Sequence, residues 1–175
     1  MSTAFKKLIE EIHKELGIPS TYGEKRKLKI QNECLNLRSA GVDIFDREIS
    51  MEETTLSSWT KMQSAASKDG IELKLVSAYR SVEYQKNLLL NKLNKGLKIN
   101  DILKVNAAPG YSEHHSGKAL DLTCPESECL EESFELTLAF AWLERYAEDY
   151  AFKMSFPRSN DYGLLYEPWH WCHQE

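Results

Sequence analysis

The stretch Ser112-Glu113-His114-His115-Ser116-Gly117-Lys118-Ala119-Leu120-Asp121 decides how we interpret the fold, because it joins two metal-binding residue types across a turn. Its glycine allows the backbone to turn sharply, and residues 118–123 then read as a strand. The first histidine and the aspartate of this stretch can therefore converge on one ion. Four of the five histidines of the chain fall in two places, here and at His170 and His173 near the C-terminus.

A second segment, Tyr166-Glu167-Pro168-Trp169-His170-Trp171, follows near the end of the chain. A catalytic zinc takes three protein ligands from histidine and carboxylate side chains and keeps one position for water. His114, Asp121 and His170 can supply these ligands, and Glu167 can remove a proton from the attacking water. Glu167 and His170 would point to opposite faces of an ideal strand, so we expect a bulge or a twist to bring them together.

Helical and alternating patterns around these two segments predict the fold class. Helical spacing and capping signals predict helices over residues 2–16, 53–68, 81–94, 99–105 and 131–148. Alternation and turn signals predict strands over residues 71–76 and 118–123, and two or three more within 151–173. Residues 18–50 give a weaker signal, with some helix around 30–37 and a turn at 41–45 that leads into a short extended piece. Together these elements indicate an α+β fold, a small antiparallel sheet flanked by helices.

Length, charge and hydropathy limit the classes of function. The 175 residues suit one domain with a hydrophobic core, and a net charge of −5 disfavours nucleic acid as a partner. No apolar run reaches the roughly 20 residues that span a bilayer, so we expect no membrane partner. Residues 1–11 lack the apolar centre of a signal peptide, and we expect a cytoplasmic protein. The four cysteines form no C-x-x-C pair, and we expect reduced thiols.

The two segments resemble motifs of the VanY-type D-alanyl-D-alanine carboxypeptidases, a family of zinc peptidases in the LAS group. The first family motif is S-x-H-x-x-G-x-A-x-D, and residues 112–121 match every fixed position. The second is E-P-W-H, which residues 167–170 match in full. Upstream, Ser77-Ala78-Tyr79-Arg80-Ser81 followed by Gln85 resembles the family segment S-x-[YF]-R-S-x-x-x-Q.

The stretch from Trp142 to Pro157 also resembles the family. In all, the resemblance covers about residues 40–173. It implies the zinc peptidase fold that the LAS group shares with the hedgehog signalling domain. We expect a single peptidase domain in which residues 41–175 form the catalytic core and residues 1–40 form a helical extension. The extension matches the family poorly, and we expect it to cover or to brace the cleft.

The resemblance implies a role for each site residue. His114, Asp121 and His170 would bind one zinc ion. Glu167 would act as general base and later as general acid. Arg80 would hold the scissile carbonyl oxygen or the substrate's C-terminal carboxylate, and a planar guanidinium suits bidentate capture of a carboxylate. The remaining expected substrate contacts are Gln85, Ser112 and Trp169.

Some positions depart from the family pattern or have no role in it. Ala151 stands where the family usually has glycine, Tyr146 where it often has asparagine, and Cys172 where an arginine is common. We interpret His173 as a surface residue and His115 as lining the cleft. We interpret Cys172 as a packed, inert thiol.

The resemblance implies a hydrolase that trims D-alanine from peptidoglycan stem peptides. Its motifs serve both D,D-cleavage of pentapeptides and L,D-cleavage of tetrapeptides. A cytoplasmic D,D-enzyme would destroy the cell's own pentapeptide precursor, so we expect L,D-cleavage of tetrapeptides in murein recycling. The alternatives are an endolysin-like L-Ala–D-Glu endopeptidase and a non-catalytic zinc-binding module. The first usually carries a basic wall-binding module, and the second has no need for Glu167.

Overall fold

Strand β4 (Ala119–Thr123) organises the fold, because all five of its residues are buried. It pairs antiparallel with β3 (Lys74–Ser77) on one side and with β6 (His170–His173) on the other. Strand β5 (Phe152–Met154) pairs with β6 and completes a four-stranded sheet of order β3-β4-β6-β5. The β4–β6 register places the aspartate of the first motif directly opposite the histidine of the second. The strands expected over 118–123 and after residue 151 are confirmed, two of them in the second region, whereas the strand expected over 71–76 begins later, at Lys74.

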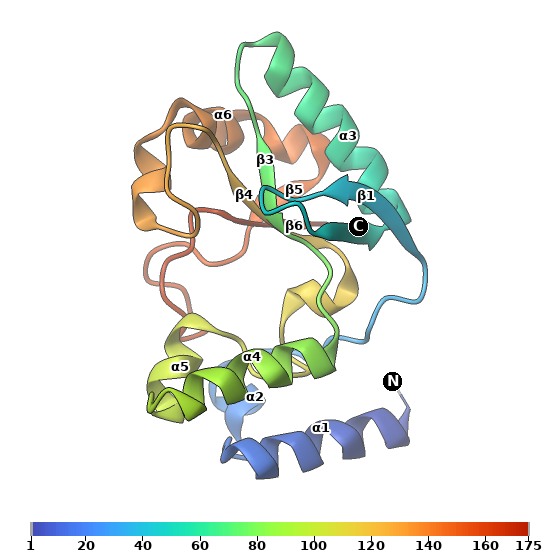
Figure 1. The fold of residues 1–175 in the computed structure, drawn as a ribbon, viewed down its shortest axis with the longest axis vertical. Helices are drawn as coiled ribbons and strands as arrows, with labels where there is room; N and C mark the ends of the chain where they lie inside the picture. Colours follow the sequence, from blue (N-terminus) through green and yellow to red (C-terminus); the bar gives the residue numbers. More distant parts are fainter. Residues whose placement is uncertain (1, 175) are drawn as a thin grey trace.

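The computed structural model describes residues 2–174, in which helices flank this sheet and confirm the α+β class (Figure 1). The helices are α1 (Thr3–Leu16), α2 (Tyr22–Lys25), α3 (Glu53–Lys68), α4 (Val82–Asn94), α5 (Ile99–Val105) and α6 (Leu138–Tyr146), with the 3-10 turns η1 (Glu113–Ser116), η2 (Glu132–Leu136) and η3 (Ala147–Tyr150). Figure 1 shows α1, α2, α4 and α5 together at one end of the molecule, and α3 and α6 beside the sheet at the other. Within the described residues, no helix combines the length and the apolarity that a bilayer span requires.

Local capping signals set the helix ends. Ser2 Oγ accepts a hydrogen bond from Phe5 N at the start of α1, and Gly17 ends that helix in the left-handed region with φ 70°. Ser81 Oγ accepts a hydrogen bond from Tyr84 N at the start of α4. The predicted helices that correspond to α1, α3, α4 and α5 are confirmed to within one residue at each end.

The prediction of one helix over residues 131–148 is wrong. The chain forms η2 and α6 as separate pieces, because Thr137 has an extended backbone with φ −91° and ψ 157°. Its Oγ1 accepts a hydrogen bond from Phe140 N and so caps α6. Phe134 before the break and Phe140 after it pack into the same core. The apolar stripe therefore continues across a break in the helix.

The helix suggested around residues 30–37 is also wrong. Residues 30–36 form no helix or strand, and the chain then enters an antiparallel hairpin of strands β1 (Leu37–Val42) and β2 (Glu48–Glu52). The Asp43 side chain closes the turn of the hairpin by accepting two backbone hydrogen bonds. The hairpin docks on the first motif through a backbone hydrogen bond that Glu52 N donates to its glycine.

The buried apolar side chains form two clusters. The larger cluster packs α3 and α6 against the sheet, around residues such as the fully buried Met51. The second cluster joins α1 to α4 and α5 through side chains such as Ile9 and Leu89. His13 Nε2 reinforces this junction by donating to the Pro109 carbonyl at 2.8 Å. Helix α1 therefore packs against α4 and supports it.

Candidate metal centre and active site

The three side chains predicted to bind zinc converge in the structure. His114 lies on η1, Asp121 on β4, and His170 is the first residue of β6. One ligand atom from each lies within 4.8 Å of the others. The three residues are only 1%, 5% and 3% exposed. A buried carboxylate is stable only beside positive charge or hydrogen-bond donors, so the surroundings of Asp121 decide whether a metal ion fits.

The donor atoms of His114 and Asp121 test whether a metal ion fits. Nδ1 of His114 lies 2.5 Å from the Ala78 carbonyl, which can only accept, so Nδ1 donates and Nε2 carries the lone pair. Burial lowers the pKa of His114 to about 4, which keeps the ring neutral. This Nε2 is buried without a hydrogen-bond partner and lies 3.2 Å from Asp121 Oδ2. Two acceptors that face each other at this distance fit a divalent cation between them.

His170 is held between two carboxylates. Its Nδ1 lies 3.1 Å from Asp121 Oδ1, and its Nε2 lies 2.9 Å from Glu113 Oε2. Burial opposes protonation of the ring, but the hydrogen bonds to Asp121 and Glu113 raise the pKa of His170 to about 10. Metal binding through Nδ1 would release this proton. Sequence reasoning missed Glu113, because it stands at a variable position of the motif.

A turn brings Glu167 next to the ligands. His170 N donates to Glu167 O at 3.1 Å and closes a four-residue turn with Pro168 at its second position. Glu167 Oε2 then lies 3.8 Å from His170 Nδ1. Burial raises the pKa of Glu167 to about 7, where a carboxyl group exchanges protons readily at neutral pH. The expected proximity is present, and its cause is a turn before β6 and not a bulge within a strand.

Arg80 faces the same cluster. Its Nη2 lies 3.4 Å from Asp121 Oδ2, and its Nη1 donates to Gln85 Oε1 at 3.5 Å. Gln85 is buried, and its amide nitrogen also donates to the Ala107 carbonyl at 2.8 Å. Gln85 therefore orients the guanidinium. Arg80 Nε is buried without a hydrogen-bond partner, so this guanidinium has unused donor capacity beside the metal ligands.

A cleft of about 320 Å³ opens onto these groups. Asp121, Arg80, Glu167 and Trp169 line it, so one surface holds a metal donor, the candidate base and two of the expected substrate contacts. The other residues on the wall of the cleft include Lys92, Asn106 and Glu131. Ser112 is buried immediately before η1, and neither Ser112 nor Gln85 is among the lining residues.

Three residues close to the ligands have structural roles. His115 is fully buried and does not line the cleft; its Nδ1 donates to the Arg80 carbonyl at 2.7 Å, and its Nε2 accepts from Gly110 N at 3.0 Å. His173 is not a surface residue, because it is only 8% exposed and its Nε2 lies 3.0 Å from a serine hydroxyl of α3. Cys172 is a packed thiol as expected, with a pKa raised by burial, and all four cysteines are free. His115 thus fixes the backbone that carries the site arginine.

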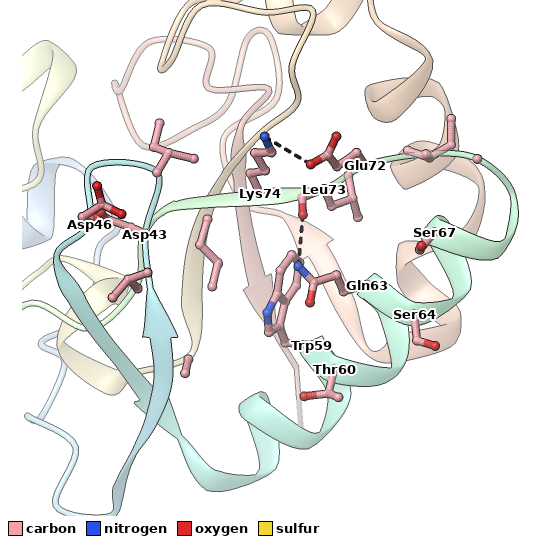
Figure 2. Close-up of a pocket in the computed structure, with 16 residues that line it drawn as sticks. Asp43, Asp46, Trp59, Thr60, Gln63, Ser64, Ser67, Glu72, Leu73 and Lys74 are labelled. Carbon is pink, nitrogen blue, oxygen red and sulfur yellow. Dashed lines mark hydrogen bonds and ion pairs between the residues drawn. The ribbon is translucent and has the colours of Figure 1, made fainter.

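A wider groove of about 930 Å³ lies between the β1–β2 hairpin, α3 and β3 (Figure 2). Three of its polar side chains have partners within the groove: Gln63 donates to the Leu73 carbonyl at 3.1 Å, and Lys74 pairs with Glu72 at 3.1 Å (Figure 2). None of the predicted zinc ligands lines this groove, and neither does the candidate base. Asp121 and Glu167, whose pKa values are strongly shifted, line the smaller cleft, so we assign the chemistry there.

Several solved structures share this fold. One is the LdcB LD-carboxypeptidase, whose structure reveals how that protein recognises peptidoglycan. It matches with a TM-score of 0.73 and 28% identity, over 82% of this chain and 70% of LdcB. VanYB in complex with D-alanine-D-alanine has a TM-score of 0.60 at 20% identity, over 89% and 80% of the two chains, which shows the fold alone. The fold and the buried donor set together define the class of LAS-type zinc peptidases.

Sequence comparison identifies the family. The family model of VanY, D-alanyl-D-alanine carboxypeptidase, matches residues 48–175, and the chain belongs to this family. The Bacillus subtilis (strain 168) protein YodJ, named as a carboxypeptidase, is 31% identical over 148 residues, which cover 77% of this chain and 54% of YodJ. A D-alanyl-D-alanine carboxypeptidase of Enterococcus faecium is 25% identical over 153 residues, which cover 83% of this chain and 46% of the Enterococcus protein. The chain spans about half the length of these curated relatives.

Proposed function

We propose that this chain is a zinc-dependent carboxypeptidase that removes the C-terminal D-alanine from peptidoglycan stem peptides. The observation that carries the proposal is the buried donor set of His114, Asp121 and His170 beside Glu167. Two of these groups, Asp121 and Glu167, line one cleft together with Arg80. A metal site, a proton acceptor and an anion-binding guanidinium are the groups that hydrolysis of a C-terminal peptide bond requires.

Each group has a defined part in the reaction. A bound zinc ion would supply Lewis-acid chemistry that polarises the scissile carbonyl and makes water a better nucleophile. Glu167, with its pKa of about 7, would take a proton from the attacking water and later give it to the departing amine of D-alanine. Arg80 would hold the carbonyl oxygen or the terminal carboxylate.

Within this activity we propose L,D-cleavage of tetrapeptides rather than D,D-cleavage of pentapeptides. The support is the likeness to LdcB, an LD-carboxypeptidase, at 28% identity and a TM-score of 0.73. The D,D-pentapeptidase VanY, solved as a mutant with Zn(II), has 21% identity and a TM-score of 0.59. A cytoplasmic location and a role in murein recycling belong to the same proposal, and fractionation of producing cells would test the location.

Mass analysis of muropeptides after incubation with the purified protein tests the function. We expect loss of one alanine from tetrapeptides, loss of the activity on chelation and its return with zinc. The ratio of kcat/KM on matched tetrapeptide and pentapeptide measures the discrimination between the two bonds. A clear preference for pentapeptide would overturn the L,D assignment alone. Cleavage between L-Ala and D-Glu would indicate an endopeptidase, and full zinc binding without turnover on any of these peptides would indicate a binding module.

A further inference from the structure

The cleft holds a second cation, Lys92, that has no part in the reaction described so far. Lys92 lies in the last turn of α4 and lines the cleft together with Arg80 and Asp121. Its Nζ donates to Asn106 Oδ1 at 2.5 Å. Asn106 directly follows α5, and Figure 1 shows α4 and α5 side by side. The ammonium group is therefore held in place at the junction of two helices.

The partner of Lys92 orients its charge without neutralising it. The Asn106 amide is neutral, and within residues 2–174 no carboxylate lies within ion-pair distance of Lys92 Nζ. An ammonium group has three N–H donors, so donation to Asn106 leaves donors for a ligand. A half-buried lysine that has only a neutral partner suits an anion that arrives from outside the protein.

Lys92 and Arg80 together give this part of the cleft an excess of positive charge. Burial lowers the pKa of Lys92, and the nearby Arg80 lowers it further. Arg80 has Asp121 at 3.4 Å, but Asp121 is a ligand of the proposed metal site and would share its charge with the ion. Arg80, Lys92 and a bound divalent ion would together carry more positive charge than the carboxylates of Asp121 and Glu167 offset, so this part of the cleft can accept one more negative charge.

The rest of the wall decides where an anion can lie. Leu130, Glu131 and Glu132 also line the cleft, so that part of the wall is acidic. Glu132 is paired with Arg158 at 3.2 Å, whereas Glu131 is exposed. A carboxylate is repelled by this acidic segment and attracted by the pair of cations. A peptide that ends in a free carboxylate therefore has one favourable direction in the cleft.

We propose that Lys92 binds the C-terminal carboxylate of the substrate beside Arg80, and that it makes the enzyme select a free C-terminus. The inference rests on the proposed carboxypeptidase function and assigns one specificity residue within it. A charge-assisted hydrogen bond of this kind adds binding energy for the free acid and none for a neutral C-terminal amide.

The test compares Lys92→Met with the wild-type protein on two matched tetrapeptides, one with a free C-terminal carboxylate and one with a C-terminal amide. We expect kcat/KM on the free acid to fall about 10- to 100-fold, mainly through KM, the range for a hydrogen bond to a charged group. We expect no change on the amide, which also shows that the variant is folded. Lys92→Arg should recover most of the loss, because it restores a positive donor.

Lys95→Met is the matched control. Lys95 is exposed, directly follows α4 and lies outside the set of residues that line the cleft. We expect it to act like wild type on both peptides. Equal losses on acid and amide in Lys92→Met, or no loss on either, would overturn the assignment of Lys92.

A binding measurement separates this inference from the proposed function. Calorimetric titration of the zinc-loaded protein with D-alanine and with D-alaninamide needs no turnover. We expect Lys92→Met to weaken D-alanine about tenfold or more and to leave D-alaninamide unchanged. This pattern would support the role of Lys92 even if the wild-type protein released no D-alanine from peptides. Unchanged D-alanine binding would refute the role even if the protein proved to be a carboxypeptidase.

Discussion

Replacement of Glu113 by glutamine should weaken zinc binding, although Glu113 is not a ligand. Glu113 Oε2 accepts a hydrogen bond from His170 Nε2 at 2.9 Å, which directs the opposite nitrogen, Nδ1, toward Asp121. Burial alone would raise the pKa of Glu113, but the hydrogen bond from His170 lowers it, so the carboxylate is charged. A carboxylate that orients a metal-binding histidine in this way supports both its tautomer and its basicity.

The expected size of the effect follows from the charge and exposure of Glu113. Loss of such a partner typically costs about 10- to 100-fold in metal affinity, or about 1.4 to 2.7 kcal/mol. The Glu113 side chain is 26% exposed, so we expect the lower half of this range. Glu113 also raises the affinity of His170 for a competing proton. A zinc ion carries two positive charges against one for the proton, so the net effect of the carboxylate favours the metal.

A competition titration against a chromophoric zinc chelator measures this change. Glu113→Gln keeps an acceptor and removes the charge, whereas Glu113→Ala removes both, so affinity should fall further in the alanine variant. The exposed Glu128 provides a matched control, and Glu128→Gln should bind zinc like wild type. Thermal unfolding without added zinc shows whether each variant is folded. Wild-type zinc affinity in both folded Glu113 variants would refute the reasoning.

Three further predictions concern catalysis and stability. Glu167→Ala should keep one zinc per chain by metal analysis and lose about 10²- to 10⁴-fold in kcat, and near wild-type turnover would exclude Glu167 as the base. Ala151 has φ 61°, so Ala151→Gly should relieve backbone strain. Part of this gain is lost because glycine has more freedom in the unfolded chain, and we expect the free energy of unfolding to rise by about 0.5 to 1 kcal/mol. An unchanged or lower Tm would contradict this. Burial lowers the pKa of His13 below its usual 6.5, so as the pH falls the unfolded chain binds the proton before the folded protein does. The contribution of His13 to stability is therefore complete above about pH 6.5 and is lost as the pH falls below that value. Urea unfolding at about pH 8 and about pH 5 should therefore show a smaller drop for His13→Gln than for wild type, and equal drops would argue against a neutral His13 in the folded protein.

The features that the sequence predicted correctly are local or lie within short motifs. The starts of α1 and α4 could be predicted from capping signals, which Ser2 and Ser81 supply in the structure, because a capping side chain binds backbone only three residues away. The structure brings together the three side chains that the motifs predicted as ligands, His114, Asp121 and His170. The approach of Asp121 to His170 depends on the β4–β6 register, and it was expected only because the two motifs together offer ligands for one ion.

The features that were missed depend on contacts between distant segments or on a weak pattern. The contact of Glu113 with His170 joins residues 57 apart in sequence and depends on the β4–β6 register. The break at Thr137 was hidden because the apolar positions continue on both sides of it. Strand β1 has mostly exposed or half-buried residues, so it lacks the alternation that marks a strand. His115 and His173 could not be classed as buried, because their partners lie in other elements.

The apolar cluster that joins α1 to α4 means that the segment that unfolds as one unit extends beyond the residues that match the family. Ile9, Ile12 and Leu16 come from α1 and pack in the same cluster as Val82 and Leu89 of α4, whereas the family match begins only at residue 48. Lys92 of α4 lines the cleft, whereas Asp121 and His170 lie on a sheet with a separate core. Local unfolding of α1 would therefore weaken substrate binding before it weakened metal binding. In hydrogen exchange, amides of α1 and α4 would become unprotected together, ahead of those in β4 and β6.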